Sequence, residues 1–296
     1  MNKLDTAKRA SILHMLVEGV SMRATARLAD VSINTVSKLL VEAGYACAEH
    51  HDRAVRGIHA RRIQCDEIWA FCYAKEKNVE RAKAAPGGAG SVWTWTAIDS
   101  DSKLMISFEV GDRSADTAKE LMEDLQPRLA TRVQLTTDGH RPYLEAVERS
   151  FGRDVDYAML VKLYGQPTGD KGHERKYSPS ECVGARKRAI QGRPSRRHVS
   201  TNHVERSNLT MQMGMRRFTR LTNGFSKKLE NHLHMLSLFF CHYNFVRTRK
   251  TLRVTPAMAA GVDDRLRDME WIVGLIDARA PKPNRPKTYR KREISN

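Results

Sequence analysis

Cysteines are few in this sequence, and none of them form recognisable pairs. The chain has 296 residues and 5 cysteines, and no two of these have the Cys-x-x-Cys spacing of a zinc ribbon. An odd number of unpaired cysteines also argues against a disulfide framework, so we expect a reducing compartment. The residues concerned are Cys47, Cys65, Cys72, Cys182 and Cys241.

Long apolar runs are missing as well. The longest lies near residues 238–241 and is far too short to span a bilayer. The first residues also lack the apolar stretch of a signal peptide. We therefore expect a soluble, cytoplasmic protein that is associated with the nucleoid and has no membrane partner.

Acidic residues are outnumbered by basic ones. The chain has 34 Asp and Glu against 51 Lys and Arg, which gives a formal net charge of +17. Residues 185–198 hold six basic residues and no acidic one, while the tail 279–296 holds seven basic residues, one Glu and three Pro. A clustered charge of this sign favours nucleic-acid binding over a merely solvated basic surface. The tail is expected to be disordered on its own, or to act as an arm that clamps DNA.

Residues 1–46 have the pattern of a helix-turn-helix domain. Apolar spacing predicts three helices, at residues 6–18, 21–28 and 33–43. For the third, we expect Ser32 as the N-cap, Gly44 as the end, and Ile33, Val36 and Leu40 as the inner face. Residues 47–61 are interpreted as a linker.

In a helix-turn-helix domain the third helix enters the major groove of DNA. The residues expected to contact bases are Asn34, Thr35 and Lys38, and those expected on phosphates are Arg23 and Arg27. A plain three-helix packing unit, without any DNA, is the alternative.

From residue 62 the apolar pattern changes to one typical of an α/β fold. We expect a mixed-sheet domain over residues 62–261 and a further helix over 262–278. Strands are predicted at 62–73, 92–99, 103–110, 133–137 and 155–160, and helices at 116–130, 142–151, 202–221 and 227–248. Residues 162–198 are interpreted as a basic loop or insertion rather than as core.

Three acidic residues fall in different kinds of element. Asp66 lies within the first strand, Asp138 at the end of a later strand, and Glu205 in the first turn of a helix. Because side chains alternate along a strand, Asp66 and Glu67 should face opposite ways, and only one of them should reach a site.

Each of these residues also has a simpler explanation. Asp66 could be a solvated residue of an edge strand, Asp138 part of an ordinary Asp-Gly turn, and Glu205 a member of a capping box with Asn202. Taken together they fit better as ligands, because the separations 138 − 66 = 72 and 205 − 138 = 67 leave room for the elements between them. Phosphodiester cleavage by two metal ions about 4 Å apart needs such a set of carboxylates.

Several histidines invite a zinc hypothesis, which the spacing does not favour. None of them has ligand spacing with a cysteine. They are His198, His203, His232, His234 and His242.

The motifs around these carboxylates resemble those of insertion-sequence transposases of the DDE class, most closely the insertion sequence one family. The resemblance is carried by the segment 202–210 around Glu205, by residues 215–223, and by the short motifs at 65–69 and 137–139. It extends from about residue 62 to residue 261. The chain departs from many members of that family in having no cysteine-based zinc element near its start.

The resemblance implies a ribonuclease H-like fold in which two strands and a helix present Asp66, Asp138 and Glu205 to two Mg²⁺ ions, or Mn²⁺. It also implies double-stranded DNA as partner, both the terminal repeats and the target, and at least a homodimer on DNA. The other residues expected on phosphates are Arg186, Lys187, Arg188, Arg196, Arg197, Arg206, Arg216 and Arg217.

The function predicted from the sequence is therefore DNA cleavage and strand transfer by a transposase. Two alternatives stay open. One is a catalytically inactive, transposase-derived regulator that binds a specific DNA sequence, and the other is a nuclease of the same fold that cuts DNA and does not join it.

Overall fold

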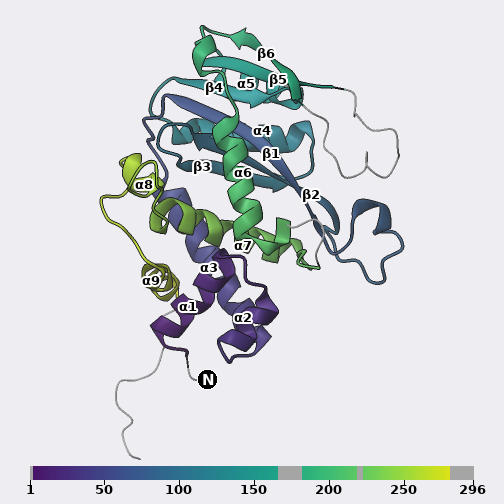
Figure 1. Cartoon of the computed structure of the whole chain (residues 1–296), viewed down its shortest axis with the longest axis vertical. Coiled ribbons are helices and arrows are strands. Elements are labelled where there is room, and N and C mark those ends of the chain that lie inside the picture. Colours follow the sequence, from purple (N-terminus) through teal and green to yellow (C-terminus); the bar gives the residue numbers. More distant parts are fainter. Residues whose placement is uncertain (1–2, 166–181, 219–222, 281–296) are drawn as a thin grey trace, which may run out of the picture.

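A six-stranded mixed sheet forms the centre of the protein (Figure 1). The structure, a computed structural model, describes residues 3–165, 182–218 and 223–280. The strands are β1 (Arg62–Cys72), β2 (Gly90–Asp99), β3 (Met105–Gly111), β4 (Val133–Asp138), β5 (Val155–Tyr164) and β6 (Cys182–Gln191).

The order of the strands across the sheet is β3-β2-β1-β4-β5-β6. β1, β2 and β3 are antiparallel neighbours, β4 and β5 run parallel to β1, and β6 is antiparallel to β5. An antiparallel three-stranded meander followed by two parallel strands is the ribonuclease H-like order, which confirms the mixed-sheet α/β class predicted from the sequence.

Helices cover both faces of the sheet. α4 (Ala115–Leu125) and α5 (Pro142–Phe151) lead into the parallel strands β4 and β5, because parallel neighbours need a crossover connection. These two helices pack against each other, and α4 contacts β2 and β3. α6 (Asn202–Gly214) contacts β1 and β2 and crosses the near face of the sheet in Figure 1.

The first helices are α1 (Thr6–Val17), α2 (Met22–Leu28) and α3 (Ile33–Ala54). Ser32 caps α3 as predicted, since its hydroxyl accepts a hydrogen bond from the backbone N–H of Thr35 at 3.1 Å. The inner face is confirmed for Val36 and Leu40, which are fully buried, and is wrong for Ile33, which is 44% exposed.

The prediction that Gly44 ends the third helix is wrong, because α3 continues to Ala54. Eight residues assigned to the linker, 47–54, are therefore helical. Gly44 serves a different purpose: a Cβ at this position would lie 2.6 Å from the Cα of His234. The glycine thus allows α3 to approach α7 (Leu229–Cys241) closely.

The N-terminal helices share one hydrophobic core with the sheet and with α7. The chain continues from α7 into a π-helical segment, η6 (His242–Val246), and then into α8 (Pro256–Ala259) and α9 (Met269–Arg279). α9 returns to pack on α1 and α3, where Asp277 accepts two hydrogen bonds from Arg9 at 2.6 and 2.9 Å.

The basic segment predicted as a loop is in part a strand. Residues 182–191 form β6 at the edge of the sheet, paired with β5 on one side only. Because nearly all its side chains are exposed, β6 lacks the alternating apolar pattern that would have revealed it. Residues 166–181 of that segment and residues 281–296 of the basic tail lie outside the described residues.

Within the three described ranges, no helix combines the length and the apolar character needed to cross a bilayer.

Candidate metal-binding active site

Asp66 lies in the middle of the central strand β1, on the face covered by α6. Its Oδ2 accepts a hydrogen bond of 2.8 Å from the side-chain amide of Asn208, which is on α6. Gln64 precedes Asp66 by two residues and shares its face, as the alternation predicts. Its Oε1 accepts the backbone N–H groups of His203 and Val204 at 2.9 and 3.2 Å.

These bonds fix the start of α6 on β1. The first backbone N–H groups of a helix have no partner within the helix, so an acceptor on a neighbouring element determines where the helix starts. Gln64 is only 4% exposed, which shields these bonds from water. The residue that follows His203 and Val204 is Glu205, so Gln64 positions the third predicted ligand through the backbone.

Asp138 ends β4, the strand next to β1. Gln64 pairs with Thr136 in parallel register, and Asp66 and Asp138 each lie two residues further along. The register therefore brings the two aspartates together at the point where β4 ends and β1 continues. Oδ1 of Asp138 also accepts the backbone N–H of His140 at 2.9 Å, so the turn chemistry proposed as an alternative is present alongside this placement.

Glu67 belongs to the same cluster, which the sequence did not predict. One carboxylate oxygen from each of Asp66, Glu67 and Asp138 lies within 4.8 Å of the other two. The expectation that only one of the adjacent residues Asp66 and Glu67 could reach the site is therefore wrong. Glu67 is on the opposite face of β1, yet its carboxylate lies close to those of Asp66 and Asp138.

The carboxylate of Glu67 is held by residues of the face opposite α6. Oε1 accepts from Nε and Nη2 of Arg113 at 2.9 and 2.6 Å, and Oε2 accepts from the hydroxyl of Tyr143 at 3.3 Å. The residue is 8% exposed. Arg113 balances its charge, which a buried carboxylate requires.

Glu205 lies near this cluster and is paired with a lysine. Its Oε1 is 2.6 Å from Nζ of Lys162, at the outer end of β5, and also accepts a hydrogen bond from the hydroxyl of Thr201. Thr201, rather than Asn202, is the N-cap residue of α6, so the capping box with Asn202 is wrong. Glu205 is not among the three carboxylates that lie within 4.8 Å of one another.

Burial and neighbouring negative charge both raise pKa values in the carboxylate cluster. Desolvation, followed by the carboxylates of Glu67 and Asp138, raises the pKa of Asp66 to about 8, and Glu205 adds to this. Desolvation and Asp138 also raise the pKa of Glu67, which Arg113 partly offsets. Clustered carboxylates that disfavour one another's charge are stabilised by a cation.

The donor set fits a hard divalent metal ion. Mg²⁺ binds oxygen ligands and uses few protein carboxylates together with water and substrate oxygens, and Mn²⁺ accepts the same ligands. Asp66, Glu67 and Asp138 offer oxygens only, and the cluster includes no cysteine or histidine.

Most of the residues predicted to contact DNA are exposed. On the N-terminal helices this holds for Arg23, Arg27, Asn34 and Lys38, while Thr35 is half-buried. On and after β6, and on and after α6, the exposed ones are Arg186, Lys187, Arg188, Arg196, Arg197, Arg206 and Arg216.

Arg217 differs from the others because its guanidinium is directed inward. It donates a hydrogen bond of 2.8 Å to the hydroxyl of Ser226, and burial lowers its pKa to about 10. Ser226 also bonds the ring of the fully buried His232 at 3.0 Å. In this arrangement Arg217 links the segment after α6 to α7.

A scan with protein-family models and a search of curated proteins give no match. Among solved structures, the chain is similar to the Mos1 transposase paired-end complex with the left transposon end, at 16% identity and a TM-score of 0.21. It is also similar to a pre-cleavage Mos1 transpososome, at 14% identity and a TM-score of 0.21, and to the Mos1 mariner paired-end complex with Mn, at 15% identity and a TM-score of 0.20.

These similarities cover 52%, 53% and 50% of this chain. They cover 60%, 60% and 57% of the respective Mos1 chains, so the chain matches less than two thirds of each. None of them supports the insertion sequence one family in particular. The fold of this chain is therefore identified by its own strand order, and its family stays a prediction from the motifs.

Proposed function

We propose that this chain is a DNA transposase of the DDE class, with Asp66, Asp138 and Glu205 as catalytic carboxylates. The observation that carries the proposal is the convergence of Asp66 and Asp138 on adjacent strands, where β4 ends, beneath a helix that carries Glu205. The insertion sequence one family is the family that the motifs favour.

Asp66 and Asp138 would hold the metal ions, two Mg²⁺ or Mn²⁺, and Glu205 would complete the set. When bound, such ions activate the attacking oxygen and stabilise the leaving oxygen of an in-line displacement. Asn208 would keep Asp66 oriented toward the site, since their hydrogen bond fixes one of its oxygens. Glu205 would have to exchange Lys162 for a metal ion.

Water would be the nucleophile for the cut at the end of the element, and the freed 3′-hydroxyl would then attack the target DNA. In each step one P–O bond forms as another breaks, so joining needs no external energy source. Because two ends must be joined, we expect at least a homodimer on DNA.

The N-terminal helices would act as a helix-turn-helix unit that binds the terminal repeats. Asn34, Thr35 and Lys38 lie at the start of α3, and they line a surface groove together with Arg279 at the end of α9. Base contacts from these three residues, and phosphate contacts from Arg23 and Arg27, are what a helix-turn-helix unit would require. The basic strand β6 and the residues that follow it would neutralise further phosphates.

Asp138→Asn tests the catalytic proposal. The variant keeps the size of the side chain and removes its charge, so it should bind element-end DNA like the wild type and lose Mg²⁺-dependent cleavage and strand transfer. Asp154→Asn is the matched control, because Asp154 is exposed with a side-chain accessibility of 76%. Cleavage retained by Asp138→Asn would refute the proposed carboxylate set.

The same assays separate the two alternatives. A regulator derived from a transposase would bind DNA and show no metal-dependent cleavage in the wild type. A nuclease of the same fold would cleave and leave the 3′ ends unjoined to target DNA.

A further inference from the structure

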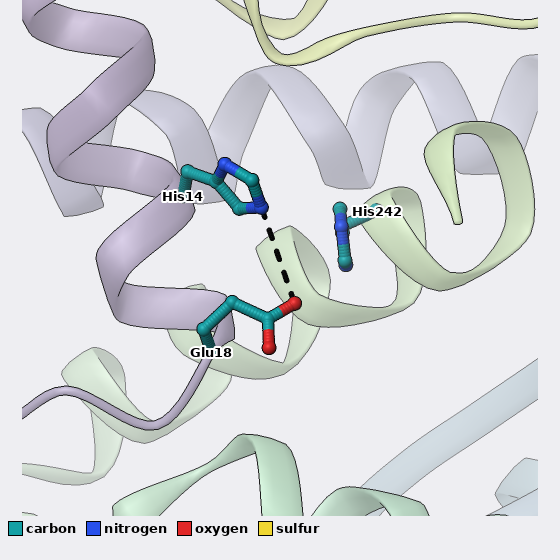
Figure 2. A group of neighbouring side chains, drawn as sticks. All are labelled: His14, Glu18 and His242. Atoms are coloured by element: carbon teal, nitrogen blue, oxygen red, sulfur yellow. Dashed lines mark ion pairs between the residues drawn. The ribbon is translucent and has the colours of Figure 1, made fainter.

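A second cluster of possible metal ligands lies between the N-terminal helices and the C-terminal part of the chain, away from the three carboxylates. His14 and Glu18 on α1 and His242 at the start of η6 each offer one ligand atom, and these atoms lie within 4.8 Å of one another. Figure 2 shows the three side chains directed toward one another from the two elements.

The two residues of α1 are placed by helix geometry. Positions i and i+4 lie on one face, one turn apart. His14 and Glu18 have this spacing, and Nε2 of His14 is 4.0 Å from Oε1 of Glu18. Both side chains are exposed, at 56% and 52%, so they can adjust their rotamers.

His242 is the fixed member of the cluster. It is 3% exposed, and its Nδ1 has no hydrogen-bond partner among the described residues. The segment that carries it is tied to the edge of the sheet, since Asn244 exchanges two hydrogen bonds with the backbone of Met105 at 3.0 and 2.9 Å. π-helical turns of this kind occur often at functional sites.

We propose that His14, Glu18 and His242 form a binding site for a transition-metal ion, most simply Zn²⁺, that links α1 to η6. Two imidazoles and one carboxylate form a known ligand set for zinc, with water in the fourth position. Donors about 2.0–2.2 Å from zinc in a tetrahedral site lie about 3.3–3.5 Å apart. The 4.0 Å between His14 and Glu18 therefore has to shorten only slightly.

Burial is the main reason that the pKa of His242 is lowered to about 3, and His14, Arg247 and Arg249 contribute to a lesser extent. The charge of the two arginines also opposes a bound cation, which the carboxylate of Glu18 partly offsets. The imidazole is therefore neutral, the form that binds metals, and Glu18 supplies the negative charge.

The site would have a structural role. α1 belongs to the unit proposed to bind DNA, whereas η6 is held by the sheet that carries the proposed active site. A shared metal ion would add a cross-link between α1 and η6, which already pack in one hydrophobic core, and would do so independently of catalysis.

Zinc titration of the full chain by calorimetry tests the proposal. The background is the double variant Asp66→Asn, Asp138→Asn, so that the carboxylate cluster does not contribute. We expect one Zn²⁺ per chain with a dissociation constant on the order of 1 µM or tighter, and a tetrahedral absorption spectrum when Co²⁺ replaces Zn²⁺.

In that background His14→Ala and Glu18→Gln should each weaken binding about 10- to 100-fold, whereas His59→Ala, a change at an exposed histidine elsewhere, should not. His242→Gln should also abolish tight binding. Should it fail to fold, the two exposed positions decide the matter alone.

Unchanged zinc binding in His14→Ala and Glu18→Gln would overturn the proposal, as would the absence of a zinc site in the background. Loss in these two variants with full binding in a folded His242→Gln protein would overturn the three-ligand site, because a pair on α1 alone would then account for the binding.

Discussion

The amide of Asn208 donates a hydrogen bond of 2.8 Å to Oδ2 of Asp66, across the interface between α6 and β1. This bond connects the strand that carries one predicted ligand with the helix that carries another. A partner of this kind orients a ligand and usually matters nearly as much as the ligand itself.

Asn208→Ala should therefore reduce metal-dependent cleavage about 10- to 100-fold while leaving DNA binding intact. The main effect should be a higher Mg²⁺ concentration for half-maximal activity, because Asp66 loses the group that orients it. Asn202→Ala, on an exposed residue at the start of the same helix, serves as control. Equal activity of the two variants would show that Asn208 does not orient Asp66.

Lys162 occupies the position of a competing cation next to Glu205. Its ammonium group is 2.6 Å from Oε1 of Glu205. Lys162→Met removes a positive charge that a metal ion must otherwise displace, so the Mg²⁺ concentration for half-maximal cleavage should fall severalfold. Lys162→Arg should behave like the wild type, and Lys119→Met on α4 is a control. A higher Mg²⁺ requirement in Lys162→Met would mean that the lysine supports the site instead.

The features of the fold that were predicted correctly are determined by residues that lie close together in the sequence. Ser32 caps α3 as predicted, because a hydroxyl three residues before a backbone N–H can accept a hydrogen bond from it wherever the helix packs. The alternation along β1 likewise places Gln64 and Asp66 on one face without any knowledge of the sheet.

The features that the sequence did not predict are determined by contacts between residues far apart in the chain. Gly44 looks like a helix end until His234 is found against it, 190 residues later in the chain (234 − 44). β6 was missed because an exposed edge strand has no buried face to impose a pattern. Glu67 was excluded by alternation alone, because spacing along one strand does not show that its carboxylate lies close to those of Asp66 and Asp138. The pairing of Lys162 with Glu205 required the register of the whole sheet.

Gly44→Ala should destabilise the protein, by about 1–3 kcal/mol. The new methyl group would meet the Cα of His234 at 2.6 Å, and backbone atoms cannot move aside cheaply. Gly274→Ala is the matched control within α9, because a Cβ there meets nothing within 4 Å. It should raise stability by about 0.5–1 kcal/mol through helix propensity. The midpoints of urea unfolding measure both changes, and a neutral Gly44→Ala would contradict the close packing of α3 on α7.

His51 should make stability fall on acidification. It is buried with one ring nitrogen bonded to the carbonyl of Ile106 at 3.0 Å, and burial lowers its pKa to about 4. The unfolded chain has a pKa of about 6.5 at this residue. Between these values the unfolded state binds more protons, so stability is present above about pH 6.5 and is lost as the pH falls toward 4.

The free energy of unfolding should be lower by about 2 kcal/mol at pH 5 than at pH 7.5 because of His51. His51→Gln can retain a donor toward the carbonyl of Ile106 and cannot titrate. The difference in unfolding free energy between the two pH values should therefore be smaller in the variant by about that amount. His59→Gln, on an exposed residue, should leave the difference unchanged. An equal difference in His51→Gln and the wild type would mean that His51 is protonated to the same extent in both states.

The strand β6 presents Arg186, Lys187 and Arg188 at the exposed edge of the sheet, directly after the residue that pairs with Lys162 of β5. If these side chains neutralise phosphates, each contact releases counterions that were condensed on the DNA, and the affinity for DNA then depends on salt concentration. Replacing all three by Gln should make the slope of log affinity against log salt less negative, by about 0.9 for each phosphate that is no longer neutralised. Sequence preference should be unchanged, because phosphate contacts carry no base information.

The exposed Arg153 and Arg265, replaced together by Gln, provide the control. A triple variant that keeps the wild-type slope would place bound DNA away from β6, and one that loses sequence preference would place bases, rather than phosphates, against this strand.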